Sequence, residues 1–406
     1  MTRGRSHPAS DTKEGGAVTP TAGTRPDEVR RHNRAALLRR LHLDGPATRA
    51  ELAAELGLNR STIKALVDEL SAVGVVSEEV PTHRHGAGRP SLLVLPQAEA
   101  VPVLAVDVGV EQVSVALAGV GGRLLGVRGW TLRRGQGSPE EAVEEIARAR
   151  VDLVDELGCE PTRAGVSVPG VVRRSDGLVH EAPNLHWTGV PFGAMLGEAL
   201  SLPVDVGNDA DLGALAEHTR GVARTSQDVV FLSADVGVGG GVILGGVSLR
   251  GSGGYVGELG HMVVNPTGRQ CYCGCRGCLE TEIGEDALCR ALNLAAGTPR
   301  PVIVAELRSL AADGELALHR LSGFAEWLTL GLTNVLNLLA PELVVLGGLL
   351  AVLPPAVVSS VTTEVRRRSL VGRAAGSVRL ATSALAGDAA LVGAAELAFE
   401  RVFAVS

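Results

Sequence analysis

The sequence predicts an α/β protein in which a small helical module that ends in a β-hairpin precedes a larger, two-lobed α/β body. Three observations support this prediction. Residues 28–96 contain three apolar helical stripes followed by strand, polar turn and strand. Residues 97–406 alternate strands with helices and repeat one strand-and-turn theme, which is an α/β pattern. Four of the six cysteines fall between Cys271 and Cys278, so that one short segment braces the second lobe.

Composition and charge narrow the class of protein. The chain of 406 residues allows two or three domains, and 45% apolar residues are sufficient for a sizeable core. Residues 1–96 carry 14 Arg or Lys against 11 Asp or Glu, whereas the remainder carries 24 against 34. A basic front on an acidic body is typical of a nucleic-acid-binding module fused to another domain.

Targeting segments are not predicted. Residues 1–25 are polar, unlike a signal peptide. The most apolar run, Leu343 to Val358, is too short to span a bilayer and contains two prolines. We therefore expect a cytoplasmic protein with no membrane partner.

The N-terminal module is predicted to hold three helices after a disordered tail of residues 1–27. The first helix spans Asp27 to Leu43 and ends at Asp44-Gly45-Pro46. The second starts at a capping box, in which the side chains of Thr48 and Glu51 satisfy free backbone amides. The third starts at Asn59. The apolar stripes are Leu37, Leu38 and Leu41, then Leu52 and Leu56, then Ile63, Leu66, Val67 and Leu70.

A strand from Gly74, a polar turn over residues 83–88 and a return strand over residues 91–95 predict a wing, so residues 28–96 are predicted to form a winged helix-turn-helix. A helix with a polar leading edge after a glycine turn suits the major groove of DNA. The extended Gly88-Arg89-Pro90 suits a narrow minor groove. The alternative is a generic three-helix domain with similar stripes. The expected DNA contacts are Thr48, Arg60, Ser61, Thr62, Lys64, Arg84 and Arg89.

The body is predicted to repeat one α/β theme. The first copy holds strands at 103–109, 112–117, 124–130 and 164–168 and a helix at 139–157. The second copy holds strands at 229–234, 242–244 and 342–346 and a final helix that opens at Gly387. Polar loops after apolar stretches, including Asn184 and residues 207–211, are expected to contact a ligand. The glycine-rich run 235–241 can cradle phosphate with backbone amides, although tight hairpins use such runs as often.

The cysteine cluster is predicted to bind zinc. Cys271 and Cys273 can bind from one turn and Cys278 from the next, and His261 is the nearest upstream imidazole. Zinc takes sulfur and imidazole ligands in a tetrahedron, and a closed four-ligand site is structural. Disulfides are the alternative, but residues so close in sequence rarely bridge well. Which three of the four cysteines bind stays open, and Cys275 is the one that we would leave out.

Two carboxylates flank this cluster. Glu258 lies three residues before His261, and Glu280 lies two residues after Cys278. A metal site would hold both carboxylates rigidly, as a hydroxyl-binding site requires. The alternative is that both are solvated charges at helix ends. The glycine-rich approach at residues 251–257 favours a loop shaped around a ligand.

Together these residues resemble the ROK family of repressors, open reading frames and kinases, over residues 28–406 and in particular its N-acetylglucosamine and xylose repressor type. The most specific match is Cys-x-Cys-Gly-x-x-Gly-Cys-x-Glu at 271–280, with Glu-x-Gly-His at 258–261. The resemblance implies an actin-like ATPase fold with lobes at about 97–225 and 226–406, the last helix packing back on the first lobe. It implies zinc on His261, Cys271, Cys273 and Cys278, and sugar contacts from Gly170, Asn208, Asp209, Glu258, His261 and Glu280.

The phosphate loops depart from the kinase pattern of this family, which pairs a base, here Asp209, with two such loops. The first should read Asp-x-Gly-Gly-Thr but reads Asp107-Val-Gly-Val-Glu111. The second should begin Leu-Gly-Thr-Gly, but Asp235 and Val236 replace the glycine and the threonine. Like charges a few ångströms apart cost about 1–4 kcal/mol at effective dielectrics between water and a protein surface. We therefore expect ATP affinity to be lost and Asp209 to be a vestigial base.

The function predicted from the sequence is that of a sugar-responsive regulator with no enzymatic activity. We expect a repressor of genes for carbohydrate uptake or catabolism that binds operator DNA as a homodimer or tetramer and is released by a monosaccharide or a derivative. One alternative is an ATP-dependent sugar kinase with a DNA tether. Another is a ligand-independent, dimeric DNA-binding protein.

Overall fold

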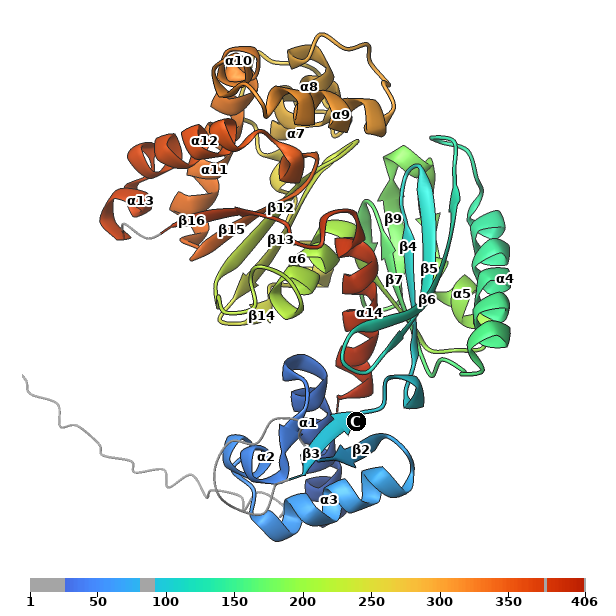
Figure 1. The fold of residues 1–406 in the computed structure, drawn as a ribbon. Coiled ribbons are helices and arrows are strands. Elements are labelled where there is room, and N and C mark those ends of the chain that lie inside the picture. Colours follow the sequence, from blue (N-terminus) through green and yellow to red (C-terminus); the bar gives the residue numbers. More distant parts are fainter. Residues whose placement is uncertain (1–25, 81–91, 376–377, 405–406) are drawn as a thin grey trace, which may run out of the picture.

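The computed structural model describes residues 26–80, 92–375 and 378–404, which form a small head and a body built on two five-stranded sheets (Figure 1). The expected tail up to residue 25 and the tip of the expected wing, with Arg84 and Arg89, lie outside these residues. Helix α1 begins at Pro26, one residue before the predicted start of the helix at Asp27, so the tail expected up to residue 27 ends earlier. Proline is favoured in the first turn of a helix, where its missing N–H costs nothing.

The head packs three helices against a small antiparallel sheet of order β1-β3-β2. The predicted stripes are buried in one core, with Leu38 and Leu56 at its margin. The predicted capping box forms, because Thr48 Oγ1 accepts from the amide of Glu51 and the Thr48 amide donates to Glu51 Oε2. The elements are α1 (Pro26–Asp44), β1 (Ala47–Thr48), α2 (Arg49–Glu55), α3 (Arg60–Ala72), β2 (Val76–Glu79) and β3 (Leu93–Pro96).

The first body sheet has the order β11-β7-β4-β5-β6, in which the first three strands are parallel and the last three antiparallel. Helices α4 and α5 cover one face, and the C-terminal helix α14 covers the other (Figure 1). Its elements are β4 (Val103–Val108), β5 (Gln112–Gly119), β6 (Arg123–Thr131), α4 (Pro139–Leu157), β7 (Ala164–Val168), α5 (Phe192–Leu200), β11 (Val204–Asn208) and α14 (Ala389–Val402). A small antiparallel sheet, β8 (Val171–Arg173), β9 (Leu178–Ala182) and β10 (Trp187–Val190), extends from β7.

The second body sheet, of order β14-β13-β12-β15-β16, repeats the first, because again three strands form an antiparallel hairpin series and two further strands pair in parallel. Its strands are β12 (Val229–Ala234), β13 (Val238–Leu244), β14 (Val247–Ser248), β15 (Leu343–Gly348) and β16 (Arg379–Thr382). One face is covered by α7 (Leu279–Ile283), α8 (Glu285–Ala291), α9 (Arg300–Leu310), α10 (Gly314–Arg320), α11 (Ser322–Leu339), α12 (Pro355–Arg368) and α13 (Leu370–Ala375).

Helix α6 (Asp209–Thr219) packs on the opposite face of the second sheet and also against α14, so α6 and α14 form a layer between the two sheets (Figure 1). The last helix thus packs on the first sheet. Among the described residues, no helix combines the length and the apolar character needed to cross a bilayer.

Most of the glycine run 235–241 is strand rather than a phosphate-cradling turn. Only residues 235–237 turn, and Gly239 and Gly241 pair with β12 inside β13. A Cβ at Gly241 would lie 2.5 Å from the carbonyl oxygen of Ala210, and one at Gly239 would lie 2.8 Å from Ala210 Cβ. These glycines therefore allow α6 to approach the second sheet, which is the hairpin alternative that the sequence left open.

Candidate functional site

A cleft lies between the two sheets. Residues from both halves of the body line it. The first half supplies the segments that follow β7 and β11, and the second half supplies the turn before β13 and the segment that contains the cysteines. All seven residues predicted to contact a ligand line this one cleft: Gly170, Asn184, Asn208, Asp209, Glu258, His261 and Glu280.

Asn208 and Asp209 enter the cleft where β11 becomes α6. Asn208 caps the helix, since its Oδ1 accepts from the amides of Ala210 and Asp211 at 2.9 and 3.1 Å, and its Nδ2 donates to the carbonyl of Gly170 at 2.9 Å. Gly170 has a φ of 104°, and a Cβ there would lie 2.2 Å from the carbonyl oxygen of Glu181. This backbone contact requires glycine. Much of the hydrogen-bonding capacity of Asn208 is therefore used to hold the site together.

Three carboxyl groups are buried around the start of α6, and of these Asp209 lines the cleft itself. Burial raises the pKa of Asp209 to about 6, and the charge of Glu258 adds to that shift. Burial also raises the pKa of Asp107 and that of Asp211 to about 7. Asp211 was not predicted as a site residue, and the only sequence signal for it was its place in the polar loop at residues 207–211. Carboxyl groups with raised pKa values often mark functional sites.

Glu280 is held by a hydrogen bond, whereas Glu258 is exposed. Glu280, in the first turn of α7, accepts a hydrogen bond from the amide of Val238 at 3.0 Å through its Oε2. Glu258 lies with one carboxylate oxygen 3.9 Å from His261 Nε2 and is exposed on the cleft wall. Glu280 is therefore not a solvated helix-end charge.

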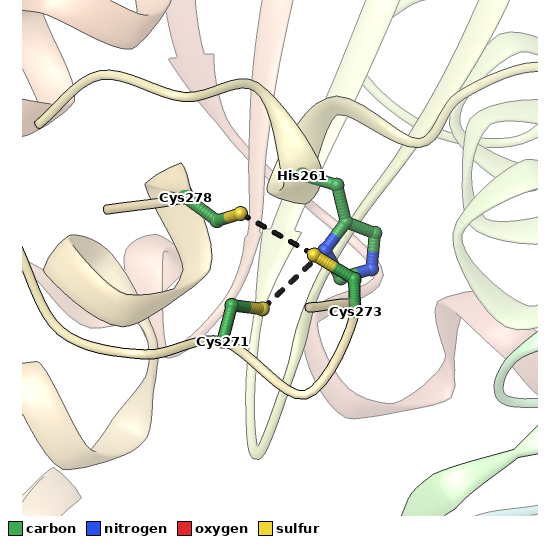
Figure 2. A group of neighbouring side chains, drawn as sticks. All are labelled: His261, Cys271, Cys273 and Cys278. Atoms are coloured by element: carbon green, nitrogen blue, oxygen red, sulfur yellow. Dashed lines mark hydrogen bonds between the residues drawn. The ribbon is translucent and has the colours of Figure 1, made fainter. Parts of the chain in front are cut away.

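His261, Cys271, Cys273 and Cys278 gather around one point, and their ligand atoms all lie within 4.8 Å of one another (Figure 2). Cys273 Sγ lies 3.5 Å from Cys278 Sγ, and Cys271 Sγ lies 3.7 Å from His261 Nδ1. All six cysteines fall within the described part of the chain and are free, so the disulfide alternative is not seen. Cys275 is exposed and outside the group. A His/Cys cluster that could hold a metal ion is thus present.

The geometry of this cluster fits a tetrahedral ion. Zinc–sulfur bonds of about 2.3 Å in a tetrahedron place neighbouring sulfurs about 3.8 Å apart, close to the 3.5 Å between the sulfurs of Cys273 and Cys278. Isolated bridges between Val263 and Cys278 and between Gln270 and Arg276 fold the segment back on itself. Gly277 has a φ of 66°, and a Cβ there would lie 1.5 Å from the carbonyl oxygen of Asn265. The tight loop is therefore built into the backbone.

Tyr272 is a cleft residue that the sequence reasoning missed. Its hydroxyl lies 2.9 Å from His261 Nε2, and its ring meets the imidazole edge-on with centroids 5.1 Å apart. It therefore contacts the ring nitrogen that does not face the cysteines. Its only sequence signal was the variable position between Cys271 and Cys273. His180 and Tyr255 do not line this cleft, but their side chains meet at 2.6 Å and join β9 to the loop after β14.

The carboxylates in the two phosphate loops do not stand unpaired, contrary to the charge argument from the sequence. Glu111 accepts from Arg134 Nε at 2.6 Å, and Asp235 forms an ion pair with Arg300. Arginines distant in sequence thus offset the charge that was expected to repel a triphosphate. A single sequence could not reveal these partners.

The head is joined to the body by a buried polar triad. His42, in α1, lies with Nε2 2.9 Å from Glu396 Oε2 of α14. Arg220 caps the C-terminal end of α6, donates to Glu396 Oε1 at 2.7 Å, and donates to the carbonyl of His42 at 2.8 Å. His42 and Glu396 are 1% and 3% exposed. Helix α6 thus carries Asp209 at its cleft end and Arg220 at its head end.

The residues predicted to contact DNA fall into two groups. Arg60, Ser61 and Lys64 are exposed near the start of α3, although Lys64 also pairs with Asp68 at 2.6 Å. Thr48 caps α2 and Thr62 is half-buried. Arg49, which was not singled out, ties α2 to β2 and α3 through Glu78 and Asp68, so its role is structural.

The duplicated sheets, the cleft between them and the layer formed by α6 and α14 define an actin-like ATPase fold of the sugar-kinase type. The model of the ROK family matches residues 103–401, and the chain belongs to this family.

Similarity to individual relatives covers different shares of the chain. The xylose repressor of Bacillus spizizenii is 28% identical over 376 residues, which are 92% of this chain and 96% of the repressor. A solved ROK family transcriptional regulator, a homolog of the E. coli MLC protein, has a TM-score of 0.75 and 24% identity over 93% of this chain and 97% of its own. The ROK glucokinase of Streptomyces griseus, solved with glucose and AMPPNP, has a TM-score of 0.64 and 27% identity over 74% of this chain and 99% of its own.

Proposed function

We propose that this protein is a transcriptional repressor that leaves its DNA operator when a monosaccharide binds the cleft. The similarity to the xylose repressor spans 376 residues, more than residues 97–406 contain, so it includes the head as well as the body. The glucokinase of known structure matches 74% of the chain. The whole-length similarity therefore favours the regulators over the kinases.

The head, residues 28–96, acts in this proposal as a winged helix-turn-helix that binds DNA. Helices α2 and α3 are joined by a short turn at Gly57, and strands β2 and β3 follow them and form a sheet with β1, which precedes α2. The exposed start of α3, with Arg60, Ser61 and Lys64, would enter the major groove. Arg84 and Arg89 would contact DNA from the wing. Operators with two-fold symmetry imply a dimer or a tetramer of the chain.

The body, residues 97–406, is the sugar receptor in this proposal. Carboxylates and amides that converge in a cleft suit the hydroxyl groups of a monosaccharide, and Asp209, Glu258 and Glu280 supply three such acceptors. Asn184, Asn208 and His261 add further polar contacts. Zinc bound by His261 and the three cysteines would fix the segment from Glu258 to Glu280, and its role would be structural, because four protein ligands close the coordination sphere.

The observation that carries this proposal is that one helix, α6, touches both sites. Its first residue, Asp209, lies in the cleft, and the residue that caps its other end, Arg220, holds His42 of the head. A sugar that draws Asp209 toward Glu258 and Glu280 would displace α6 as a unit, because the eleven residues form one rigid helix. Such a displacement would change the placement of the head. The change in the free energy of DNA binding cannot exceed the difference in the free energy of sugar binding between the two positions of the head.

DNA binding by the purified chain tests the proposal. Fragments selected from a random pool would be bound with a defined footprint, and D-xylose, D-glucose and N-acetyl-D-glucosamine would be titrated onto the complex. We expect one of these sugars, or a close derivative, to weaken DNA binding at least tenfold. Binding that no sugar changes would support instead a ligand-independent DNA-binding protein.

A sugar kinase is the second candidate, because Asp209 lies in the cleft with a pKa of about 6, which suits a general base. This candidate predicts ATP-dependent phosphorylation of a hexose that Asp209→Asn abolishes. The phosphate loops argue against it. The amides of Gly109 and Asp235 donate to the carbonyls of Gln112 and Gly237, both at 2.8 Å, and so are committed to the protein's own hairpins.

A further inference from the structure

Five charged side chains join the two halves of the body at the end of the cleft where the two phosphate loops meet. We call this group the five-charge cluster. The first half supplies Glu111 and Arg134, and the second half supplies Asp235, Glu285 and Arg300.

Arg134 is the central member. It follows β6 of the first sheet, and its Nε donates to Glu111 Oε1 at 2.6 Å. Its Nη1 and Nη2 donate to the two carboxylate oxygens of Glu285 at 2.6 and 2.9 Å. Glu285 is the first residue of α8, which packs on the second sheet, and it is 3% exposed. The guanidinium thus makes a two-pronged ion pair across the cleft, a geometry that fixes orientation as well as distance.

The second cation, Arg300, completes the cluster. It forms an ion pair with Asp235, and the amide of Glu285 donates to the carbonyl of Asp235 at 2.9 Å. Burial lowers the pKa of Arg300, and the negative charge of Glu111 opposes that shift. The five groups therefore interact as one network. With three carboxylates and two guanidinium groups its net charge is negative, so it does not attract a phosphate group.

Backbone amides at the same place are occupied as well. The amide of Val238 donates to Glu280 Oε2, in addition to the amides of Gly109 and Asp235 already described. A polyphosphate needs such amides free, because glycine-rich loops bind it through backbone N–H groups. In this chain these three amides hold the loops and Glu280 instead.

We propose that Arg134 determines the ligand selectivity of the cleft. Its guanidinium group joins the two halves of the body at the end of the cleft where the phosphate groups of a nucleotide would bind. This inference rests on the proposed function as a sugar receptor. Arg134 is a positioning residue, because it does not line the cleft and acts on it through Glu111 and Glu285. The amide of Gly284 donates to the carbonyl of Glu280 at 2.8 Å, so the start of α8 is joined through the backbone to the residue that places its carboxylate in the cleft. The cleft then takes an uncharged sugar without a nucleotide.

Hydrogen exchange of the full-length, ligand-free protein tests the brace. Arg134→Gln should raise the exchange of peptides that contain residues 107–112 and 234–239 about tenfold, within the range for partners in one ion-pair network. Arg134→Lys should restore part of the protection, since it keeps the charge and loses the two-pronged contact. Arg133→Gln, at the exposed neighbouring position, should leave exchange unchanged.

Equal exchange in Arg134→Gln, Arg133→Gln and wild type would overturn the proposal. Should Arg134→Gln fail to fold, Glu285→Gln tests the same contact with an uncharged side chain of the same shape. A second experiment adds Mg²⁺ and AMPPNP to the wild-type protein. We expect hydrogen exchange of the two peptides to stay unchanged, and slower exchange with the nucleotide would also overturn the proposal. Neither experiment uses sugar or DNA. A negative result therefore contradicts only the role of Arg134, whereas the repressor proposal is tested separately by the titration of the DNA complex with sugars.

Discussion

His42 Nε2 and Glu396 Oε2 lie 2.9 Å apart in a site that is almost closed to solvent, and this contact docks the head on the last helix of the body. Arg220 completes the contact by pairing with the other oxygen of Glu396. Although burial raises the pKa of Glu396, the hydrogen bond from His42 and the charge and hydrogen bond of Arg220 lower it overall. The carboxylate is therefore ionised at neutral pH.

Removing the charge of Glu396 should uncouple the head from the body. Glu396→Gln leaves the guanidinium of Arg220 without the negative charge that it pairs with, and breaking a buried ion pair in this way costs about 3–5 kcal/mol. We expect a lower melting temperature and DNA binding that sugar no longer changes. Glu400→Gln is the matched control on the same helix, because Glu400 is more exposed and contacts Arg250 at 3.4 Å. If both variants retain a full sugar response, the triad does not transmit the signal.

Replacing one cysteine of the cluster should release the metal. Cys271→Ser is expected to lower bound zinc from one ion per chain to well below half and to weaken sugar binding, because Glu258 and Glu280 lose their anchor. Elemental analysis and calorimetry measure the two effects. Cys275→Ser is the control, since Cys275 is exposed and outside the cluster. Equal zinc loss in both variants would contradict the ligand set.

Sugar affinity should depend on pH through Asp209, whose pKa burial raises from 3.8 to about 6. An ionised carboxylate accepts the proton of a sugar hydroxyl, so affinity should rise up to about tenfold per pH unit below pH 6 and level off above it. Calorimetry between pH 5 and 8 measures the profile. Asp209→Asn should bind weakly at every pH, and an unchanged slope in this variant would assign the titration to another group.

The buried carboxyl groups of Asp107, Asp209 and Asp211 determine whether the free energy of unfolding rises or falls with pH. Their raised pKa values mean that the folded protein holds protons that the unfolded chain has lost. The free energy of unfolding should therefore fall as pH rises from about 4 to about 7, and this contribution should be constant above that window. Denaturant titrations of the wild type and of Asp107→Asn provide the check, because the variant should show a shallower decline.

The start of α3 should carry much of the DNA affinity. Arg60→Gln is expected to weaken DNA binding by about 1–3 kcal/mol, as loss of a specific arginine contact does. Arg308→Gln should have no effect, because Arg308 is exposed on α9, at the opposite end of the molecule from the head (Figure 1). Fluorescence anisotropy compares the two variants. Equal affinities would exclude α3 as the reading helix.

Much of this architecture could be predicted because it depends on local patterns. The helix over residues 139–157 and the strand over residues 164–168 have the predicted bounds, since caps and continuous apolar runs mark them. The signature at 271–280 located a His/Cys cluster because its ligands are close in sequence. The glycine run 235–241 was ambiguous, because whether it turns or pairs depends on α6, which packs against it.

Contacts between distant segments could not be predicted. Arg134 and Glu285 are 151 residues apart, and His42 and Glu396 are 354 residues apart. A single sequence gives no signal that such side chains meet. For the same reason the negative charge of Asp235 was interpreted as unpaired, although Arg300 neutralises it.

The most direct measurement of the central claim is a titration of the protein–DNA complex with D-xylose, D-glucose and N-acetyl-D-glucosamine, followed by fluorescence anisotropy. For wild type, one of these sugars should lower DNA affinity at least tenfold, whereas Asp209→Asn and Glu396→Gln should bind DNA and not respond. DNA binding that is identical with and without every sugar, or a full response in both variants, would contradict the account.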